Sequence, residues 1–434
     1  MAQKYELFKD SGSIWIGEIP SHWNIGNFRY FGEFTKGKLP STTNIEGKGL
    51  PIIGASEMLG KECRTFTEET NVPLCNSDDI LILWDGANAG IISSRHKGVV
   101  SSTAVKYHCL STKIDKNYLF YYLKSVEPFF KDKVNGTTIP HMNIKYINEV
   151  PMLIPTPQEQ TSIVNLLDQK CKEIESLISL QEEMITELQA YKQSVITEAV
   201  TKGLNPNAKM KDSGIEWIGE IPEEWQTIKL NRIMGFIGGY AFNSNKYAKE
   251  QTHNQVIRIG NVKNNYLKLD ASPIFIDDNV AIEAAKCKLN ENCILFTMTG
   301  TKGKRDYFYT LLLKKEHFKN KDLYLNQRVG CFVQKTHNID MRYYNYLLKD
   351  NHILDSIFLY ETGTANQGNL GIETINRTIL QFPPLVDQCA IANYLDTQAS
   401  QIDELIALKQ MKIDQLVEYK KSVIYEYVTG KKRV

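Results

Sequence analysis

The sequence predicts an α+β protein: two mixed α/β globular domains joined by two long helices that form an antiparallel coiled coil, the whole being an internal pseudo-two-fold repeat. Three observations support this class. Two long stretches carry the same apolar seam at helical spacing, and a 14-residue motif occurs twice. The segments between them contain short apolar runs that end in glycine-rich loops, in the same order both times.

The first long stretch, 158–203, has no proline and no glycine before Gly203. Its apolar residues recur every three or four positions, which is typical of one face of a helix. Pro157 suits a helix start, and Gly203 with Pro206 suits its end. At about 1.5 Å per residue this helix is on the order of 65 Å long, so its seam needs a partner of similar length.

The stretch 387–430 supplies that partner. At a constant offset Gln160 matches Gln388, and Ile163 matches Ile391. The match continues to the ends, where the run Tyr-Lys-x-Ser-Val-Ile occurs at 191–196 and at 419–424. Two helices with the same seam pack most simply on each other as a coiled coil.

The repeated motif reads DSGSIWIGEIPSHW at 10–23 and DSGIEWIGEIPEEW at 212–225, with ten of the 14 positions identical. The run Gly-Glu-Ile-Pro, with a tryptophan on either side, indicates a turn with two aromatic anchors. We expect the anchors to pack on the neighbouring helix end rather than to bind a ligand. They are Trp15 and Trp23 in the first copy and Trp217 and Trp225 in the second.

These repeats divide the chain into a first domain at 1–155, a central helix segment at 156–211, a second domain at 212–384 and a C-terminal helix at 385–434. Both globular parts contain a strand that enters a glycine-rich loop, a polar step into another strand, and a tyrosine-rich helix, expected at 116–133 and 341–358. Their loop sequences differ far more than the helices and the turn motif do. The tyrosines of these helices are expected in the core.

The composition, 42% apolar and 23% charged over 434 residues, is that of a globular protein with more than one core. No apolar run is long enough to cross a bilayer and the first residues lack a signal-peptide core, so a cytoplasmic location is expected. Eight scattered cysteines without a C-x-x-C pair predict reduced thiols.

The net charge of +1 hides an uneven distribution. Residues 156–225 hold six Lys and Arg against 13 Asp and Glu, whereas residues 226–384 hold 21 against 14. A polyanion is attracted by the second segment and repelled by the first. Ordinary scatter of surface charge is the alternative explanation.

A shared frame that holds two divergent domains suits a reader of two sites. Half-sites roughly 34 Å apart face the same side of a DNA duplex, and a coiled-coil spacer can set a separation of that order. The pseudo-repeat gives the two domains related orientations, as a two-fold dimer would.

These motifs resemble the specificity subunit of Type I restriction–modification systems. The resemblance rests on the two copies of the turn motif, the Pro-x-x-x-Gln-x-x-Ile-x-x-x-Leu-Asp pattern at 384–396 with its near-copy from Thr156, and the two Tyr-Lys-x-Ser-Val-Ile runs. It covers the whole chain. It implies two target-recognition domains that each bind half of a split target in double-stranded DNA. It also implies docking of two modification subunits, which methylate adenine with S-adenosylmethionine, and of restriction/translocase subunits.

The same resemblance implies that this chain has no catalytic centre, and its residues agree. The Pro-Pro at 383–384 lacks the flanking residues of an amino-methyltransferase motif, and the Gly300–Arg305 stretch lacks the spacing of a nucleotide-binding P-loop. The histidines are isolated, so no metal or cofactor is expected.

Loop residues able to meet phosphates or base edges are therefore the candidate DNA contacts. An exposed Asn or Lys is more often simply solvated, but these loops recur at matching places in both domains. In the first domain the candidates are Lys36, Lys38, Asn88, Ser102, Thr103, Thr137, Thr138, His141 and Asn143. In the second they are Tyr240, Asn243, Lys246, Lys302, Lys304, Arg305, Asn326, Gln327, Arg328, Asn366 and Gln367.

Two hypotheses of different classes remain. The first is a DNA-sequence reader without catalytic activity that scaffolds a methyltransferase and nuclease assembly. The alternative is a coiled-coil scaffold whose domains bind proteins. This alternative does not explain the excess of basic residues in 226–384. A specificity half of a fused restriction–methylation enzyme differs from the first only in its partners.

Overall fold

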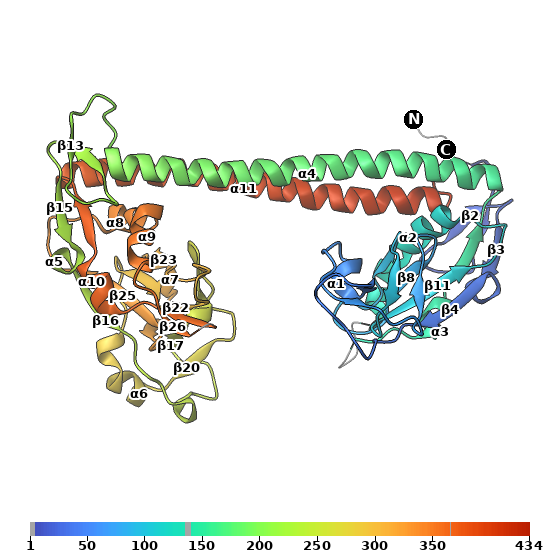
Figure 1. Ribbon diagram of the computed structural model, residues 1–434, viewed down its shortest axis with the longest axis horizontal. Helices are drawn as coiled ribbons and strands as arrows, with labels where there is room; N and C mark the ends of the chain where they lie inside the picture. The colour runs from blue at the N-terminus through green and yellow to red at the C-terminus, as the bar shows by residue number, and fades with distance from the viewer. Residues whose placement is uncertain (1–4, 135–139, 365) are drawn as a thin grey trace. The chain divides into compact units, whose positions relative to one another are not determined.

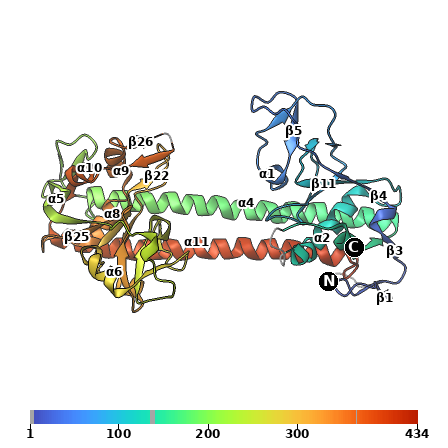
Figure 2. The ribbon, with the colours of Figure 1, turned by 90° about the horizontal axis from the view of Figure 1, so that it is seen from below.

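The computed structural model describes residues 5–134, 140–364 and 366–434. The chain forms two compact units: the first is Met1–Glu183 with Lys409–Val434, and the second is Met184–Leu408. Each unit combines a globular α/β body with part of both long helices (Figures 1 and 2). None of the described helices combines the length and the apolar character needed to cross a membrane.

The two long helices are α4 (Pro157–Lys202) and α11 (Leu385–Val428), which confirms the helices expected from the sequence. They lie antiparallel, side by side, within each unit (Figure 1). In the first unit Lys420 of α11 pairs with Glu175 of α4 over 2.5 Å. In the second unit Lys192 of α4 pairs with Asp403 of α11 over 2.7 Å.

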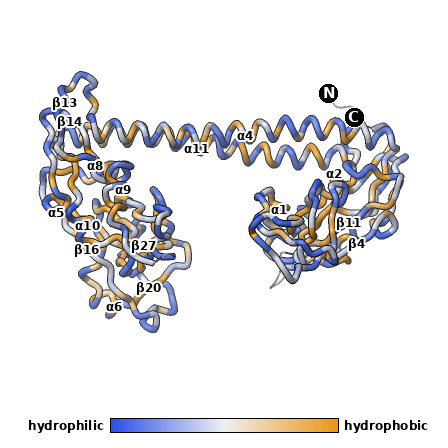
Figure 3. The backbone as a smooth tube through the Cα atoms, viewed as in Figure 1, coloured by the Kyte–Doolittle hydropathy of each residue, from blue (hydrophilic) through white to orange (hydrophobic). Residues whose placement is uncertain are grey.

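Hydrophobic and hydrophilic residues alternate along both helices (Figure 3). Ile163, Leu167 and Ile174 are buried, as the seam predicts, but Leu177 and Tyr191 of the same seam are about half exposed. Two helices alone bury only a narrow stripe of side chains, so apolar residues that flank the stripe stay accessible.

The body of the first unit has two four-stranded sheets, in the orders β4-β11-β8-β9 and β6-β5-β10-β7. The first is antiparallel throughout, and the second contains one parallel pair, β5 with β10. The strands of these sheets are β4 (Gly32–Lys36), β5 (Leu50–Ile53), β6 (Phe66–Thr67), β7 (Leu74–Cys75), β8 (Ile80–Leu83), β9 (Ile92–Ser94), β10 (Gly98–Val100) and β11 (Ala104–Cys109). Hairpin β1 (Phe8–Asp10) with β2 (Glu18–Pro20), pair β3 (Asn24–Asn27) with β12 (Pro151–Ile154), and helices α1 (Ala55–Met58), α2 (Lys116–Val134) and α3 (Ile144–Asn148) complete it.

The second unit repeats this plan with sheets ordered β16-β25-β21-β23 and β20-β17-β24. Their strands are β16 (Met234–Gly238), β17 (Asn254–Ile257), β20 (Ile274–Ile276), β21 (Ile294–Thr297), β23 (Thr310–Leu312), β24 (Asp322–Leu325) and β25 (Val329–Gln334). The smaller pairings join β13 (Met210–Asp212) with β14 (Glu220–Pro222), β15 (Gln226–Lys229) with β28 (Ile379–Phe382), β18 (Val262–Lys263) with β19 (Tyr266–Leu267), and β22 (Thr299–Gly300) with β27 (Gln367–Asn369) and β26 (Thr362–Thr364). The helices of its body are α5 (Leu230–Ile233), α6 (Asp278–Glu283), α7 (Lys315–Phe318), α8 (Met341–Leu347), α9 (Asn351–Phe358) and α10 (Ile372–Arg377).

The repeated turn motif packs on the start of a long helix in each unit. Trp23 is fully buried and donates its indole N–H to Glu159 over 3.2 Å, and Trp225 donates to Asp387 over 3.1 Å. Glu159 and Asp387 occupy equivalent places in α4 and α11, so both copies meet the same demand. The other two tryptophans differ: Trp15 stacks on Phe129, whereas Trp217 is 37% exposed and is only a weak anchor.

A buried glutamine explains why Gln160 and Gln388 match. The side chain of Gln160 accepts from the amide of Asp115 over 2.7 Å and donates to the carbonyls of Lys113 and Pro155, both over 3.0 Å. Gln388 makes the same three bonds, to Asp340, Asn338 and Pro383. Each glutamine thus fastens the first turn of a long helix to the loop that precedes the tyrosine-rich helix.

The tyrosine-rich helices lie in the cores, as expected, with Tyr118, Tyr122, Tyr343 and Tyr344 fully buried. The single helix expected at 341–358 is wrong, because the structure has two helices, α8 and α9, with a break at 348–350. Asp350 is the reason: its buried carboxylate caps α9 at His352 and Ile353 and accepts from the Thr197 hydroxyl over 2.6 Å.

Candidate nucleic-acid interface

In the first unit, four loops meet at one end of the β4-β11-β8-β9 sheet. They are the segments 36–38, 84–90, 101–103 and 140–143, here called the first loop cluster. The Trp84 amide donates to the Thr103 carbonyl over 2.8 Å, and the Met142 amide donates to the Trp84 carbonyl over 2.7 Å. Main-chain bonds therefore bring together loops that lie far apart in the sequence.

Gly37 has a steric role in this cluster. A Cβ atom at this position would sit 2.1 Å from the carbonyl oxygen of Ser101, so no other residue fits without a backbone shift. Lys36 and Lys38 flank this glycine and are both exposed. These loops thus meet here, and the polar step at Ser101–Thr103 leads into a strand as expected, because β11 begins at Ala104.

The second unit builds the same arrangement from 238–240, 298–306, 326–328 and 366–370, here called the second loop cluster. The Met298 amide donates to the Arg328 carbonyl and the Leu370 amide donates to the Met298 carbonyl, each over 3.1 Å. A Cβ on Gly239 would sit 1.9 Å from the carbonyl oxygen of Asn326. Gly239 is therefore required for the same steric reason as Gly37 in the first unit. The equivalence includes isolated bridge Asp85–His141, which matches the pairing of Thr299 with Asn369.

Three charged or titratable side chains meet in the first loop cluster. Lys36 donates to one carboxylate oxygen of Asp85 over 2.6 Å, and the ring of His141 bonds to the other. Partial burial raises the pKa of the Asp85 carboxyl, but the bonds from Lys36 and His141 outweigh it and the net pKa lies below its ordinary value. Asp85 is therefore ionised at neutral pH, and Lys36 also lies 5.8 Å from the ring centre of Trp84.

The remaining candidates of the first unit take different places. Asn88 and Ser102 are exposed in the first loop cluster, and Thr103 is partly exposed there. Asn143 caps α3 by accepting from the Lys145 amide over 2.9 Å. Thr137 and Thr138 lie outside the described residues.

In the second loop cluster, Gln327 and Arg328 are exposed, and Asn326 is partly exposed. Here too the polar step at 326–328 leads into a strand, since β25 begins at Val329. Tyr240 packs against Phe242 with ring centres 4.9 Å apart and is partly buried. Asn366 is exposed and Gln367 partly exposed at the tip of the β26–β27 hairpin.

Two side chains of the glycine-flanked loop 300–306 are tied to residues outside the loop. The Lys302 ammonium donates to the Gly363 carbonyl over 3.0 Å, and Arg305 forms an ion pair with Asp355 and lies 5.7 Å from the ring centre of Phe358. Lys304 is exposed and makes no ion pair with the described residues. It is therefore the lysine of this loop best placed to meet a phosphate.

Asn243 and Lys246 follow the 238–240 segment and are engaged in local contacts. Asn243 accepts from the Asn245 amide over 3.0 Å at the start of a 3-10 turn. Lys246 forms an ion pair with Glu283 of α6 over 2.8 Å. Both side chains have a structural partner.

Sequence reasoning missed two residues of the first loop cluster and one residue beside the second. Trp84 and Asp85 belong to a segment whose Asn88 was singled out, and Arg258 follows β17 directly, beside Asn326, whose amide donates to the Ile257 carbonyl. The buried Nε of Arg258 has no hydrogen-bond partner among the described residues. A position-by-position alignment of the two globular segments could have singled out Asp85. It places this charged residue opposite the uncharged Thr299.

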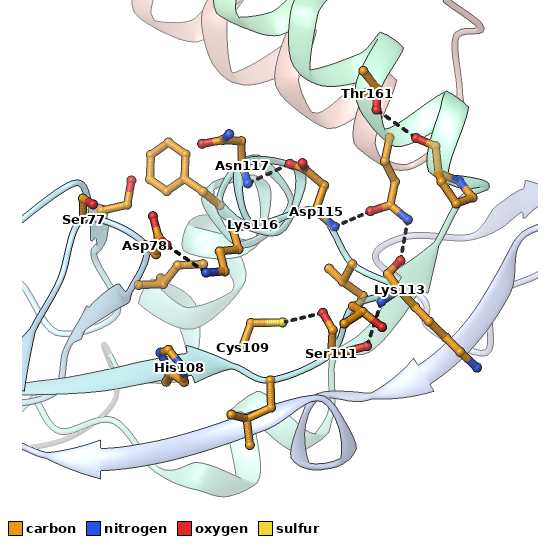
Figure 4. Close-up of a pocket in the computed structure, with 18 of the residues that line it drawn as sticks. Ser77, Asp78, His108, Cys109, Ser111, Lys113, Asp115, Lys116, Asn117 and Thr161 are labelled. Carbon is orange, nitrogen blue, oxygen red and sulfur yellow. Dashed lines mark hydrogen bonds and ion pairs between the residues drawn. The ribbon is translucent and has the colours of Figure 1, made fainter.

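A cavity of about 720 Å³ lies at the other end of the first unit's sheet, beside the start of α2 and of α4 (Figure 4). Several of its charged groups have partners: Asp78 bonds to Lys116 over 2.8 Å, and His108 bonds over 2.5 Å to Asp79, which is buried behind the cavity wall. Within the described residues no group of three or more His, Cys, Asp or Glu side chains could hold a metal ion. These contacts serve the packing of the first unit.

Comparison with known proteins gives a consistent result. A family model described as the Type I restriction modification DNA specificity domain matches residues 20–184 and 222–419. The specificity subunit of the Type I restriction enzyme MjaVIII from Methanocaldococcus jannaschii is 28% identical, over 99% of this chain and 97% of that protein. The putative MjaX specificity subunit of the same organism is 24% identical, over 99% and 98%.

This chain has the fold of a solved structure that was reported for the structural basis of complex assembly and conformational transition of the type I R-M system. Its TM-score is 0.66 at 13% identity, and the match covers 95% of this chain and 99% of that one. At this identity the likeness concerns the fold alone.

Proposed function

We propose how this chain acts from one premise: it belongs to the Type I restriction modification DNA specificity family, whose model matches it twice, at residues 20–184 and at 222–419. The chain is a DNA sequence-specificity subunit of a Type I restriction–modification system. Each unit supplies one recognition domain, and the two domains read the two halves of a split target in double-stranded DNA.

The single observation that carries this reading is the pair of equivalent loop clusters. Their main chains make the same bonds, at Trp84 and at Met298, whereas the side chains presented differ. A fixed scaffold with variable loops is what two modules need to recognise different base sequences. Exposed Asn, Gln, Arg and Lys side chains in these loops have the donors and acceptors for base edges and phosphates.

The long helices support docking of two copies of one partner. Three exposed apolar positions recur at the repeat offset: Leu177 with Leu405 at 47% and 46% exposed, Leu180 with Leu408 at 48% and 60%, and Tyr419 with Tyr191 at 55% and 56%. The first member of each pair lies in the first unit and the second member in the second unit. Exposed apolar side chains that repeat in this way indicate two equivalent protein contacts.

These partners are two modification subunits, which methylate adenine, and the complex further recruits restriction/translocase subunits. The chain itself contributes recognition and spacing and no catalytic group. We place the assembly in the cytoplasm, where the cell's DNA lies.

The test is a salt titration of DNA binding by the chain assembled with its modification subunits. The expected result is tight duplex binding that weakens linearly in log affinity against log salt, with a slope of about −0.9 for each phosphate contact. The modification subunits alone serve as the control. Equal affinity with and without this chain would contradict the proposed role and favour a protein scaffold.

A further inference from the structure

We propose that Asp85 is a specificity-determining residue, whose carboxylate accepts a hydrogen bond from the exocyclic amino group of a cytosine or adenine in the half-site read by the first unit. This inference rests on the proposed function, because it takes the first loop cluster as the surface that meets DNA.

The position of Asp85 is fixed from both main chain and side chain. Its amide donates to the Thr103 carbonyl over 3.3 Å, and its backbone bridges to His141. Lys36 and His141 each bond one carboxylate oxygen. A side chain held this firmly presents its remaining acceptor sites in one direction, which is what base reading requires.

Chemistry restricts what that carboxylate can meet. An ionised carboxylate has about four acceptor sites and no donor. Two sites are occupied here, and the Asp85 side chain is still 36% exposed. Phosphates repel it, so on a surface that contacts DNA it can approach only a base edge that offers a donor. In the major groove those donors are cytosine N4 and adenine N6.

Lys36 strengthens the argument. Its ammonium has three donors, of which Asp85 takes one, and it lies 2.6 Å from the carboxylate oxygen. A donor and an acceptor therefore stand side by side. The major-groove edge of every base pair also carries an amino donor next to a carbonyl acceptor, so one base pair can engage both groups.

The second unit provides an internal contrast. At the places of Asp85 and His141 it has Thr299 and Asn369, which carry no charge. At the place of Lys36 it has Gly238, the last residue of β16. The arrangement of Lys36, Asp85 and His141 thus occurs at this place only in the first unit, and the loss of Asp85 should alter one half-site only.

The experiment uses the whole complex of this chain with its modification subunits, acting on duplexes with randomised half-sites, followed by sequencing of the methylated products. Asp85→Asn keeps the shape of the side chain but replaces one acceptor oxygen by a donor amino group. Asp85→Ala removes the whole carboxylate. Asp78→Asn is the matched control, because this carboxylate also pairs with a lysine, Lys116, but lies at the other end of the sheet. The preference of each variant is compared with wild type at every position.

The expected result is a loss of preference for cytosine or adenine at one position of one half-site, by about fivefold to tenfold, with the other half-site unchanged. Which base loses its preference tells cytosine from adenine. An unchanged motif with a uniformly lower methylation rate and a smaller salt slope would overturn the inference, because Asp85 would then only position Lys36 for phosphate. If wild type selects no split motif, the proposed function itself fails, which is a distinct outcome.

Discussion

Replacing Gln160 with leucine tests how the repeated frame is held together. This side chain is 1% exposed and makes three hydrogen bonds, to the Asp115 amide and to the carbonyls of Lys113 and Pro155. Leucine fills a similar volume but removes the partner of all three main-chain groups, of which the Pro155 carbonyl makes its bond in a buried place. At about 1 kcal/mol for each neutral hydrogen bond, the first unit should lose about 3 kcal/mol of stability.

Amide hydrogen exchange locates that loss. Because about 1.4 kcal/mol is a tenfold change in an opening equilibrium, exchange at the start of α2 and α4 should accelerate roughly 100-fold. Gln388→Leu should do the same at α8 and the start of α11, in the second unit. Gln158→Leu, at an exposed site on the same turn of α4, is the control and should change little. Gln160→Leu exchange profiles that match those of Gln158→Leu would refute the reasoning.

Three further predictions concern binding, assembly and pH. Lys302→Ala with Lys304→Ala should weaken DNA binding for all sequences and make the salt slope less steep by about 1, mainly through Lys304, while the modification subunits stay bound; an unchanged slope in a salt titration counts against phosphate contact. Leu177→Glu with Leu180→Glu should release one modification subunit and retain the other, which native mass spectrometry would detect as a lower complex mass; retention of both would argue against docking at these positions. Burial and the nearby Lys192 lower the pKa of Lys349 to about 8. Between that pH and about 10.5 the unfolded chain therefore binds more protons than the folded chain. The stability of the second unit should consequently rise with pH across this window. Lys349→Met should remove that rise in thermal unfolding measured from pH 7 to 10.5, and a difference between the variants that does not vary with pH would show that the lysine keeps its ordinary pKa.

The frame of this molecule could be predicted from its sequence because its information is local and repeated. Helical spacing from Ile163 to Val195 specifies a long helix without reference to any other segment. The match of Gln160 to Gln388 and of Trp23 to Trp225 marks positions where the same contact is made twice. The structure confirms both helices and shows the bonds that these residues make.

The details that sequence reasoning missed depend on contacts between distant segments. Asp85 pairs with residues 49 and 56 positions away, and nothing in its own loop reveals them. The break between α8 and α9 depends on Asp350 reaching a threonine of α4, 153 positions earlier. Trp15 stacks on Phe129, whereas Trp217 in the same motif is 37% exposed, so identical sequence does not give identical packing.

The loop candidates show the same limit at the level of single side chains. A lysine in a glycine-flanked loop is a reasonable phosphate ligand. However, the ammonium of Lys302 donates to a main-chain carbonyl, and that of Lys246 forms an ion pair with Glu283. Lys304 and Arg328, which have the same general character, remain exposed. Charge and flexibility predict which loops matter, and tertiary contacts decide which side chains in them are available.

The most direct test of the central claim is a genome-wide map of methylated adenines in a host that supplies the modification subunit, with and without this chain. The account predicts a split motif, two specific half-sites with an unspecific spacer, that is present with the chain and vanishes without it. The same map obtained in both hosts, with the modification subunit active, would contradict DNA specificity and leave the protein scaffold as the better explanation.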